Sequence, residues 1–590
     1  MLQLTHRRWL VVALVLLLVP VILLACGPTD EETEPPEKEE EVEEEVDVEP
    51  DTKYGGQVVM TMGSDLIAMS PTYTGTATIY PVKNTVFDSI VRMDSDGVPQ
   101  PHLATDWDIS SDGLEITFYL RDDVVFHDGE PFDAHDVYFT YMLCMYPPMA
   151  SSKHPYLSAL KGYRDFWESI GELSSSLEAG DISDDDYQVR MKDYYEAWSA
   201  LNAIEVVDDY TITFHFSEPS GSFMTVGTEV GIVASHLLEG HEDYIMETDY
   251  VYNPIGTGPF YFAEWERGEY WILKAFEDHW AGRPYLDQMI TRVIPDATTR
   301  LHEFLAGNLD YFVPPVADLQ TIMDTAGKKV LDAPGVGWAH FSMNLERGFF
   351  GDVRVRQAIH HMIDKQAMHD HINEGWHQVA HHPFNPGIAW CHVPMDDPFP
   401  LDLDKAAELL IDAGFTEQAD GWYKDGERLE FTVRVSTGEL AVEAVTVLQQ
   451  FLARANVPIE IDQLDLAAWQ TAIFASDFDM MYFGWTGHPD PDAYIRTVHH
   501  SDGIGGRNVM LYRNDRVDEL FEKAGRVFDL EDRAVYYREM QEILAMEVPK
   551  IYFNWASFYH AFDEDLEGAE PHPYRSQGIF FSLKDWYWDR

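Results

Sequence analysis

Residues 101–107 read PHLATDW, residues 111–113 read SDG, residues 120 and 121 read LR, and residues 125–137 read VFHDGEPFDAHDV. Polar and apolar residues alternate over 115–120, which predicts a half-buried strand. Asp128 and Gly129 favour a tight turn, because Asp bonds its own backbone and Gly adopts positive φ without steric cost. This stretch therefore predicts a strand followed by a tight turn.

The rest of the body, from residue 53 onward, mixes strands with helices. Alternating or β-branched runs predict further strands, and apolar residues at helical spacing or an acidic first residue predict helices. The strands are expected at 56–62, 211–216, 271–275 and 428–435, and the helices at 352–372, 404–413 and 442–455. Apolar residues at helical spacing on both sides of an acidic run predict a helical hairpin over 153–203. The body is therefore α/β or α+β.

Two further blocks accompany the first. Residues 253–260 read NPIGTGPF, and FSMN at 341–344 is followed by VRVRQAI at 353–359 and IDK at 363–365. In this order the three blocks resemble the extracellular solute-binding proteins of ABC importers, in the large family that takes up dipeptides, oligopeptides, nickel and some oligosaccharides. The resemblance covers nearly all of the body, 55–582.

The resemblance implies an α/β, two-lobed periplasmic-binding-protein fold, type II-like and of cluster C, with an extra subdomain in the first lobe. Lobe one would cover 53–334, with the helical insertion at 153–203. Lobe two would cover 335–554, and 555–590 would return to lobe one. An open form would capture a solute, the lobes would close on it about two crossing strands, and the closed form would dock on a permease.

The N-terminus has the pattern of an export signal. Arg7 and Arg8 precede an apolar run at 9–25, which predicts a signal peptide over 1–25; an uncleaved membrane anchor is the alternative. The sequence LLAC ending at Cys26 resembles the bacterial lipobox, which implies a lipid on Cys26 and a place on the cell membrane, facing the periplasm or the extracellular space. Residues 26–52 are almost wholly acidic, Pro and Thr, and predict an unfolded tether.

The formal net charge is −63, and about fifty of the excess negative charges belong to the body. Such a charge excludes nucleic acid and anionic lipid surfaces as partners, because both would be repelled. Three explanations of this negative charge are open: a saline habitat, a cationic ligand, or no specific role. The charge is spread along the whole chain, which favours the saline habitat. We expect a monomer.

The chain shows no motif of a catalytic centre. It lacks a G-x-S-x-G elbow, an H-E-x-x-H pair, a P-loop and a dinucleotide-binding fingerprint. We therefore expect a binding protein without catalytic residues, cofactor or metal. The sequence does not exclude a pair of carboxylates for glycoside hydrolysis, because a chain with so many acidic residues contains such pairs by chance.

Histidines and cysteines leave two subsidiary possibilities. The eight histidines at 360, 361, 369, 371, 377, 381, 382 and 392 are dense enough to hold a transition metal, and His377 with His381 has helical i, i+4 spacing. Gly375 and Pro383 interrupt helix there, so surface histidines that pair with carboxylates are the favoured interpretation. Cys144 and Cys391 lie far apart in the sequence, which disfavours a disulfide although export would permit one.

The family's ligand lies in a cleft between the lobes, and the matching element here is FGWTG at 483–487. Trp485 is the main candidate, because an aromatic ring at a cleft stacks on a ligand or covers it; a core tryptophan is the alternative. The resemblance adds these ligand-binding candidates: Asp490, Trp338, Thr486, His488 and, near the first strand, Ser64 and Asp65.

Two departures bear on the ligand. Peptide binders of the family usually carry an Asp about three residues after that Trp to hold the ligand's amino terminus, and His488 stands there. Dipeptide binders also use an Arg for the ligand's carboxylate, and only Arg434 lies near the expected place. We expect an oligopeptide or another small solute as ligand and ABC permease subunits as partners. An oligosaccharide is the alternative ligand, given 16 Trp and 30 Tyr, and an extracellular glycoside hydrolase is the alternative class.

Overall fold

The structure is a computed structural model that describes residues 53–590 except 71, 73–76, 152, 226–229, 242–244, 246, 247, 574 and 575. The signal peptide expected over 1–25, the lipid on Cys26 and the tether to residue 52 lie outside the described residues. In the part of the chain that is described, no helix combines the length and the apolar composition of a membrane span.

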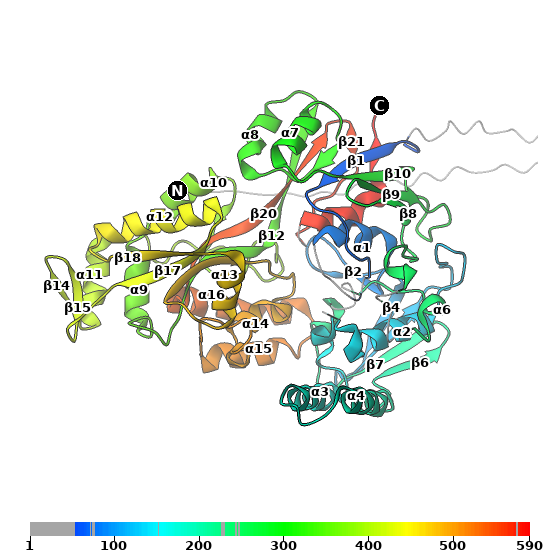
Figure 1. Ribbon diagram of the computed structural model, residues 1–590, viewed down its shortest axis with the longest axis horizontal. Helices are drawn as coiled ribbons and strands as arrows, with labels where there is room; N and C mark the ends of the chain where they lie inside the picture. The colour runs from blue at the N-terminus through cyan, green and yellow to red at the C-terminus, as the bar shows by residue number, and fades with distance from the viewer. Residues whose placement is uncertain are drawn as a thin grey trace, which may run out of the picture. The chain divides into compact units, whose positions relative to one another are not determined.

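One mixed, 11-stranded sheet runs through the body, and two of its strands join two lobes (Figure 1). Its main path runs β18 (Ile459–Leu464), β17 (Phe431–Ser436), β19 (Met480–Trp485), β12 (Lys328–Met343), β20 (Lys550–Asp563), β11 (Tyr311–Phe312), β1 (Gln57–Met62), β10 (Gln288–Val293), β9 (Tyr270–Ala275) and β8 (Phe260–Glu266). The short β13 (Gln378–Val379) pairs with β20 beside this path. Because β12 and β20 pair antiparallel along most of their length, they carry the sheet from one lobe into the other.

Lobe one has its own core and a second sheet. Its largest cluster of buried apolar side chains draws on residues 58–311 and again on 562–586. The second sheet runs β4 (Ala104–Ile109), β5 (Glu115–Leu120), β7 (Thr211–His215) and β6 (Ile204–Asp208). Helix α2 (Ala134–Met145) begins at Asp133, whose side chain caps it in a capping box with Asp136. The strand and the tight turn predicted for the opening stretch are thus confirmed, and α2 follows them.

Two helices occupy the stretch where we predicted a hairpin. They are α3 (Tyr163–Glu178) and α4 (Asp184–Ser199), the latter capped by the Ser183 hydroxyl, and they lie side by side. Phe166, Ile170 and Leu173 form the buried face of α3. Figure 1 shows the pair at the edge of lobe one, beside β6 and β7.

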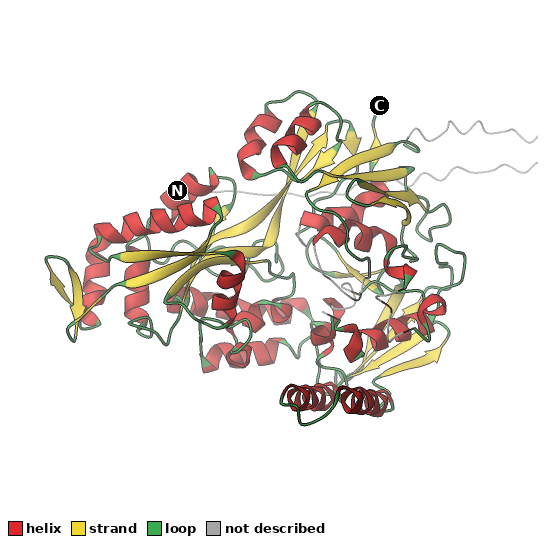
Figure 2. Ribbon diagram, in the orientation of Figure 1, coloured by secondary structure: helices red, strands yellow, loops and turns green. Residues whose placement is uncertain are grey.

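Lobe two packs helices around the β12, β17, β18 and β19 end of the sheet (Figure 2). Its buried clusters draw on residues 336–555. The helices are α9 (Val353–His361), α10 (Lys365–Asn373), α11 (Leu403–Asp412), α12 (Glu439–Arg454), α13 (Leu466–Phe474), α14 (Ile495–His499), α15 (Asp515–Ala524) and α16 (Leu530–Glu547). The predicted lobe boundaries, after 334 and after 554, fall inside β12 and β20 and stay predictions.

One predicted helix is divided. The pattern over 352–372 suggested a single helix, but α9 ends at His361 and α10 begins at Lys365. Asp364 causes the break, because its carboxylate accepts the Ala367 N–H at 2.9 Å and so caps a new helix. Ile363, expected on the apolar face, is buried within the connection. The helices predicted at 404–413 and 442–455 are confirmed within a few residues as α11 and α12.

The dense histidines do not lie on the surface as expected. Four of them are buried, namely 360, 361, 369 and 382. His377 and His381 flank the strand β13, so their spacing is not that of a helix. The exposed His371 does pair with a carboxylate, since its Nε2 lies 3.2 Å from Glu443.

The two body cysteines are buried and free, so no disulfide joins them. Cys144 lies on α2 and Cys391 lies in lobe two. Burial raises the pKa of the Cys144 thiol to about 12 and that of Cys391 further above its usual range. Both thiols therefore stay protonated and unreactive in the folded chain.

Buried histidines make the fold sensitive to acid. Burial lowers the pKa of His102 to about 4 and those of His382 and His560 to about 3. A histidine that is neutral when folded, but titrates near 6.5 when unfolded, gives stability that is present above pH 6.5 and is lost as pH falls toward the folded pKa.

We predict that the free energy of unfolding falls between pH 7.5 and pH 5, by about 2 kcal/mol for each such histidine. Urea titrations at half-unit steps in pH measure it. The His560→Gln variant should show a shallower slope, and His371→Gln, which changes an exposed histidine, should keep the wild-type slope. Equal slopes for the wild type and His560→Gln would contradict this assignment.

Candidate functional site

Three tryptophans lie side by side where the two joining strands pass between the lobes. Trp338 on β12 pairs with Trp485 at the end of β19 and with Trp555 on β20. The register of β12 and β20 shifts between Pro334 and Trp338, so the pair is irregular at this point. A second shift follows between Ala339 and His340, and this irregular stretch marks the crossing between the lobes.

The loop that follows β19 approaches β12 backbone to backbone. Gly487 has φ +68°, and a Cβ there would overlap the carbonyl oxygen of Val336. Only glycine meets both conditions without strain. This close approach fixes the start of the loop that carries Thr486 and His488.

Trp485 and Thr486 form the accessible part of this region. Trp485 is half-buried, and the centroid of its ring lies 5.3 Å from that of Phe483 and 5.8 Å from that of Tyr494. Thr486 is exposed. Trp338 is only 2% exposed. The indole N–H groups of Trp338 and Trp485 are buried without an acceptor among the described residues. Each unpaired donor costs about 1–3 kcal/mol, which an acceptor on a bound molecule would offset.

His488 lies at the meeting point of the lobes. It is 5% exposed, and its Nδ1 accepts the Asp490 N–H at 3.0 Å. Its ring lies 5.9 Å from that of Tyr156, which belongs to the segment just before α3. The imidazole therefore stands where the resemblance implied a carboxylate, in contact with both lobes.

Asp490 does not line the cleft as expected. It is 1% exposed, and both of its carboxylate oxygens already accept hydrogen bonds. Arg533 on α16 donates to both of them, at 2.8 and 2.9 Å, and to Asp492 at 3.0 Å. Tyr537 accepts a further bond from Arg533 at 2.9 Å. Burial raises the pKa of Asp492, while Arg533 opposes that shift. We call Asp490, Asp492 and Arg533 the buried triad. Through its two aspartates it anchors the loop that follows β19 to α16.

The remaining candidates have structural partners away from Trp485. Asp65 accepts bonds from the Trp265 indole at 3.0 Å and from the Gly268 N–H at 2.7 Å, and so ties the end of β1 to the β8–β9 hairpin. Ser64 beside it is exposed. Arg434 pairs with Asp462 at 3.1 Å and with Asp477 at 2.9 Å, so its guanidinium forms ion pairs within lobe two.

The lobes also touch through a second contact that the sequence did not reveal. The Gly221 N–H donates to the carbonyl of Gly525 at 2.8 Å. A Cβ on Gly221 would overlap the Val527 carbonyl, so the two backbones meet directly. Beside them Arg526 lies 3.5 Å from Glu218. We call this the Gly221 contact.

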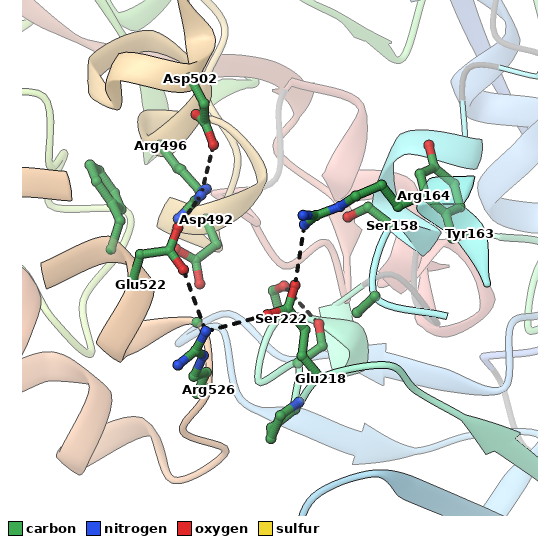
Figure 3. A pocket seen from close by; sticks show the side chains of 15 residues that line it. Ser158, Tyr163, Arg164, Glu218, Ser222, Asp492, Arg496, Asp502, Glu522 and Arg526 are labelled. Atoms are coloured by element: carbon green, nitrogen blue, oxygen red, sulfur yellow. Dashed lines mark hydrogen bonds and ion pairs between the residues drawn. The ribbon is translucent and has the colours of Figure 1, made fainter. Parts of the chain in front are cut away.

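A cavity of about 580 Å³ opens beside the Gly221 contact (Figure 3). Lobe one supplies residues 158, 159, 163, 164, 218–220 and 222 to its wall, and lobe two supplies residues 492, 496, 502, 521, 522, 525 and 526. Figure 3 shows Arg164 and Arg526 approaching Glu218 from opposite sides, with Arg496 between Asp502 and Glu522. The cavity wall is thus polar, and its charged groups are largely paired with one another.

Comparisons with known proteins agree with this architecture. Residues 98–506 match the family described as "Bacterial extracellular solute-binding proteins, family 5 Middle". The oligopeptide-binding protein AppA of Bacillus subtilis is 25% identical over 555 residues, 91% of this chain and 92% of the relative. Heme-binding protein A of Haemophilus influenzae is 27% identical over 468 residues, 77% of this chain and 78% of the relative.

Among solved structures, NikZ from Campylobacter jejuni in complex with Ni(L-His) shares 25% identity and a TM-score of 0.70, covering 90% of this chain and 99% of that one. CtaP from Listeria monocytogenes, a substrate-binding protein of an ABC transporter, has a TM-score of 0.74 at 22% identity and shares the fold, over 91% of this chain and 100% of that one. This chain belongs to the family 5 extracellular solute-binding proteins. It is a non-catalytic, substrate-binding protein of the ABC-importer class.

The sequence pointed to Trp485 and its loop but missed the groups that fix them. Arg533, Gly221 and Tyr156 carry no motif of their own, since each acts through residues distant in the chain. The sequence did contain one signal for the buried triad. An aspartate stands on either side of Pro491, and two carboxylates that become buried need a cation as partner.

We predict that Arg533→Met lowers the free energy of unfolding by about 3–5 kcal/mol, because it leaves two buried carboxylates without a cation. Urea unfolding at pH 7.5 measures the change. Arg526→Met is the matched control, since the Arg526 side chain is 58% exposed, and it should change stability by less than about 1 kcal/mol. Similar losses for both variants would contradict the role of the buried triad.

We predict that Gly221→Ala weakens the contact between the lobes without unfolding either one, because the added methyl group overlaps the Val527 carbonyl. Small-angle X-ray scattering should show a larger radius of gyration than for the wild type. Gly171→Ala on α3, where a Cβ meets nothing within 4 Å, should leave it unchanged. A wild-type value for Gly221→Ala would show that this contact does not hold the lobes together.

Proposed function

We propose that this protein captures a peptide-like solute between its lobes, against Trp485, Thr486 and His488, and delivers it to an ABC importer. The observation that carries the proposal is the half-buried Trp485 beside the exposed Thr486 at the crossing strands, because its indole N–H has no acceptor among the described residues. Peptide backbones offer carbonyl groups that accept such bonds. Names of the relatives, which include oligopeptide-, dipeptide- and heme-binding proteins, support a solute of this size range.

The charges near Trp485 argue against a free dipeptide. His488 replaces the expected carboxylate, Asp490 is taken by Arg533, and Arg434 is taken by two aspartates. A short zwitterion buried there would leave its charged ends unpaired, at a cost of several kcal/mol. Longer peptides keep their charged ends away from this wall, and neutral solutes have none.

An oligosaccharide is the second candidate. The row of Trp338, Trp485 and Trp555 favours it, because sugar faces stack on aromatic rings. Two of the three rings are buried, however, which leaves Trp485 as the accessible surface for stacking. The peptide-like solute therefore remains the first proposal.

Calorimetric titration tests the ligand class. We expect peptides of five to eight residues to bind more tightly than dipeptides or cello-oligosaccharides, and Trp485→Ala to weaken the binding at least 10-fold. Trp588→Ala, which changes a half-buried indole in lobe one, is the control and should bind as the wild type does. Tight dipeptide binding that survives Trp485→Ala would refute both the ligand class and the place.

We also propose that Cys26 carries a lipid that anchors the chain, with 27–52 as an acidic tether. Cys26→Ser should abolish incorporation of labelled fatty acid and release the protein from the membrane fraction, while the body stays folded. Label retained by the variant would refute the anchor. The saline habitat suggested by the acidic surface stays a prediction. The melting temperature, measured at increasing concentrations of KCl, tests it and should rise because salt screens the repulsion between the negative charges.

A further inference from the structure

One cluster of side chains outside the Trp485 region has the donors of a metal site. In the part of the chain that the structure describes, a single group of His, Cys, Asp and Glu side chains brings three ligand atoms within 4.8 Å of one another. Its members are His500, which follows α14, Asp502 in the next turn, and Glu522 on α15. Asp502 and Glu522 also line the 580 Å³ cavity.

His500 presents its buried ring nitrogen Nε2 to Glu522. The side chain is 9% exposed, and Nε2 is buried without a hydrogen-bond partner among the described residues. Nε2 lies 3.5 Å from Oε1 of Glu522, whereas donors in a tetrahedral zinc site stand about 3.3–3.4 Å apart for bonds of about 2.0–2.1 Å. The two atoms are therefore already close to the separation that one shared ion imposes.

The other ring nitrogen fixes the orientation of the imidazole. Nδ1 lies 2.6 Å from Oδ1 of Asp502. The backbone N–H of Asp502 also approaches Nδ1, at 3.1 Å. When Nδ1 carries the ring proton and donates it to the carboxylate, Nε2 keeps a bare lone pair, which is the usual arrangement in metal-bound histidines. Asp502 thus has one oxygen that orients the ring and a second oxygen facing Arg496.

Arg496 holds the two carboxylates together and does not use up their oxygens. Its Nη2 lies 2.9 Å from Oδ2 of Asp502 and 2.8 Å from Oε1 of Glu522. Asp518 adds a third acid, with Oδ1 3.9 Å from the His500 ring. Arg526 also lies 3.9 Å from Oε2 of Glu522, so three acids face two arginines and the cluster keeps an excess negative charge that attracts a cation.

We propose that His500, Asp502 and Glu522 bind a divalent transition-metal ion of the zinc or nickel type at the edge of the interlobe cavity. Nitrogen and carboxylate donors without sulfur suit these ions. Because Asp502 and Glu522 line the cavity, the ion's remaining coordination positions face it, open to water or to a donor group on a solute.

Titration of the metal-stripped, full-length wild-type protein with Zn²⁺, without any solute, tests the site independently of the proposed transport function. We expect one tight equivalent above the weak binding of a surface rich in acids. His500→Gln should weaken that equivalent at least 10-fold. His371→Gln, which changes an exposed histidine 3.2 Å from Glu443, is the matched control and should keep it.

A second variant protects the test against misfolding of His500→Gln. The Glu522 side chain is 46% exposed, so Glu522→Gln should fold normally and still weaken Zn²⁺ binding at least 10-fold. Cobalt substituted for zinc should give visible absorption bands of a nitrogen–oxygen site in the wild type and lose them in both variants. A tight equivalent that persists in Glu522→Gln, or its absence from the wild type, would overturn the proposal.

Discussion

The pairing of β12 with β20 is the constraint on which the rest of the structure depends. These two strands are the middle of the main sheet, and each contributes residues to both lobes. Each lobe buries its own core, and the strand pair, the Gly221 contact and the rings of His488 and Tyr156 are among the links between them. A solute-binding site at the irregular point of this pair would sense any change in the angle between the lobes.

The buried triad shows how one local ionic group supports that site. Arg533 reaches from α16 to the loop after β19, and it also donates to the Gly221 carbonyl at 3.5 Å. One guanidinium therefore touches the loop behind Trp485 and the contact that joins the lobes. A displacement of either element changes the surroundings of the other, which gives the two a direct physical coupling.

Much of the fold could be predicted from the sequence, because strand alternation, capping residues and the three blocks are local signals. The opening stretch led to β5 and to the turn at Asp128 and Gly129. Local pattern failed at 352–372, where the Asp364 cap outweighs a continuous apolar stripe. The site was predictable only as far as the loop after β19, since Asp490 and Arg434 resemble ligand-binding groups until their partners are seen.

The burial of Cys144 and Cys391 has a practical and a biological consequence. Both thiols are shielded from oxidants and from maleimide reagents, so an exported chain escapes mispaired disulfides once it has folded. A cysteine introduced at the exposed Thr486 would then be the accessible thiol of the body. A fluorophore attached there would test the proposed site by reporting each arrival and departure of a solute in real time, with no need to replace Cys144 or Cys391.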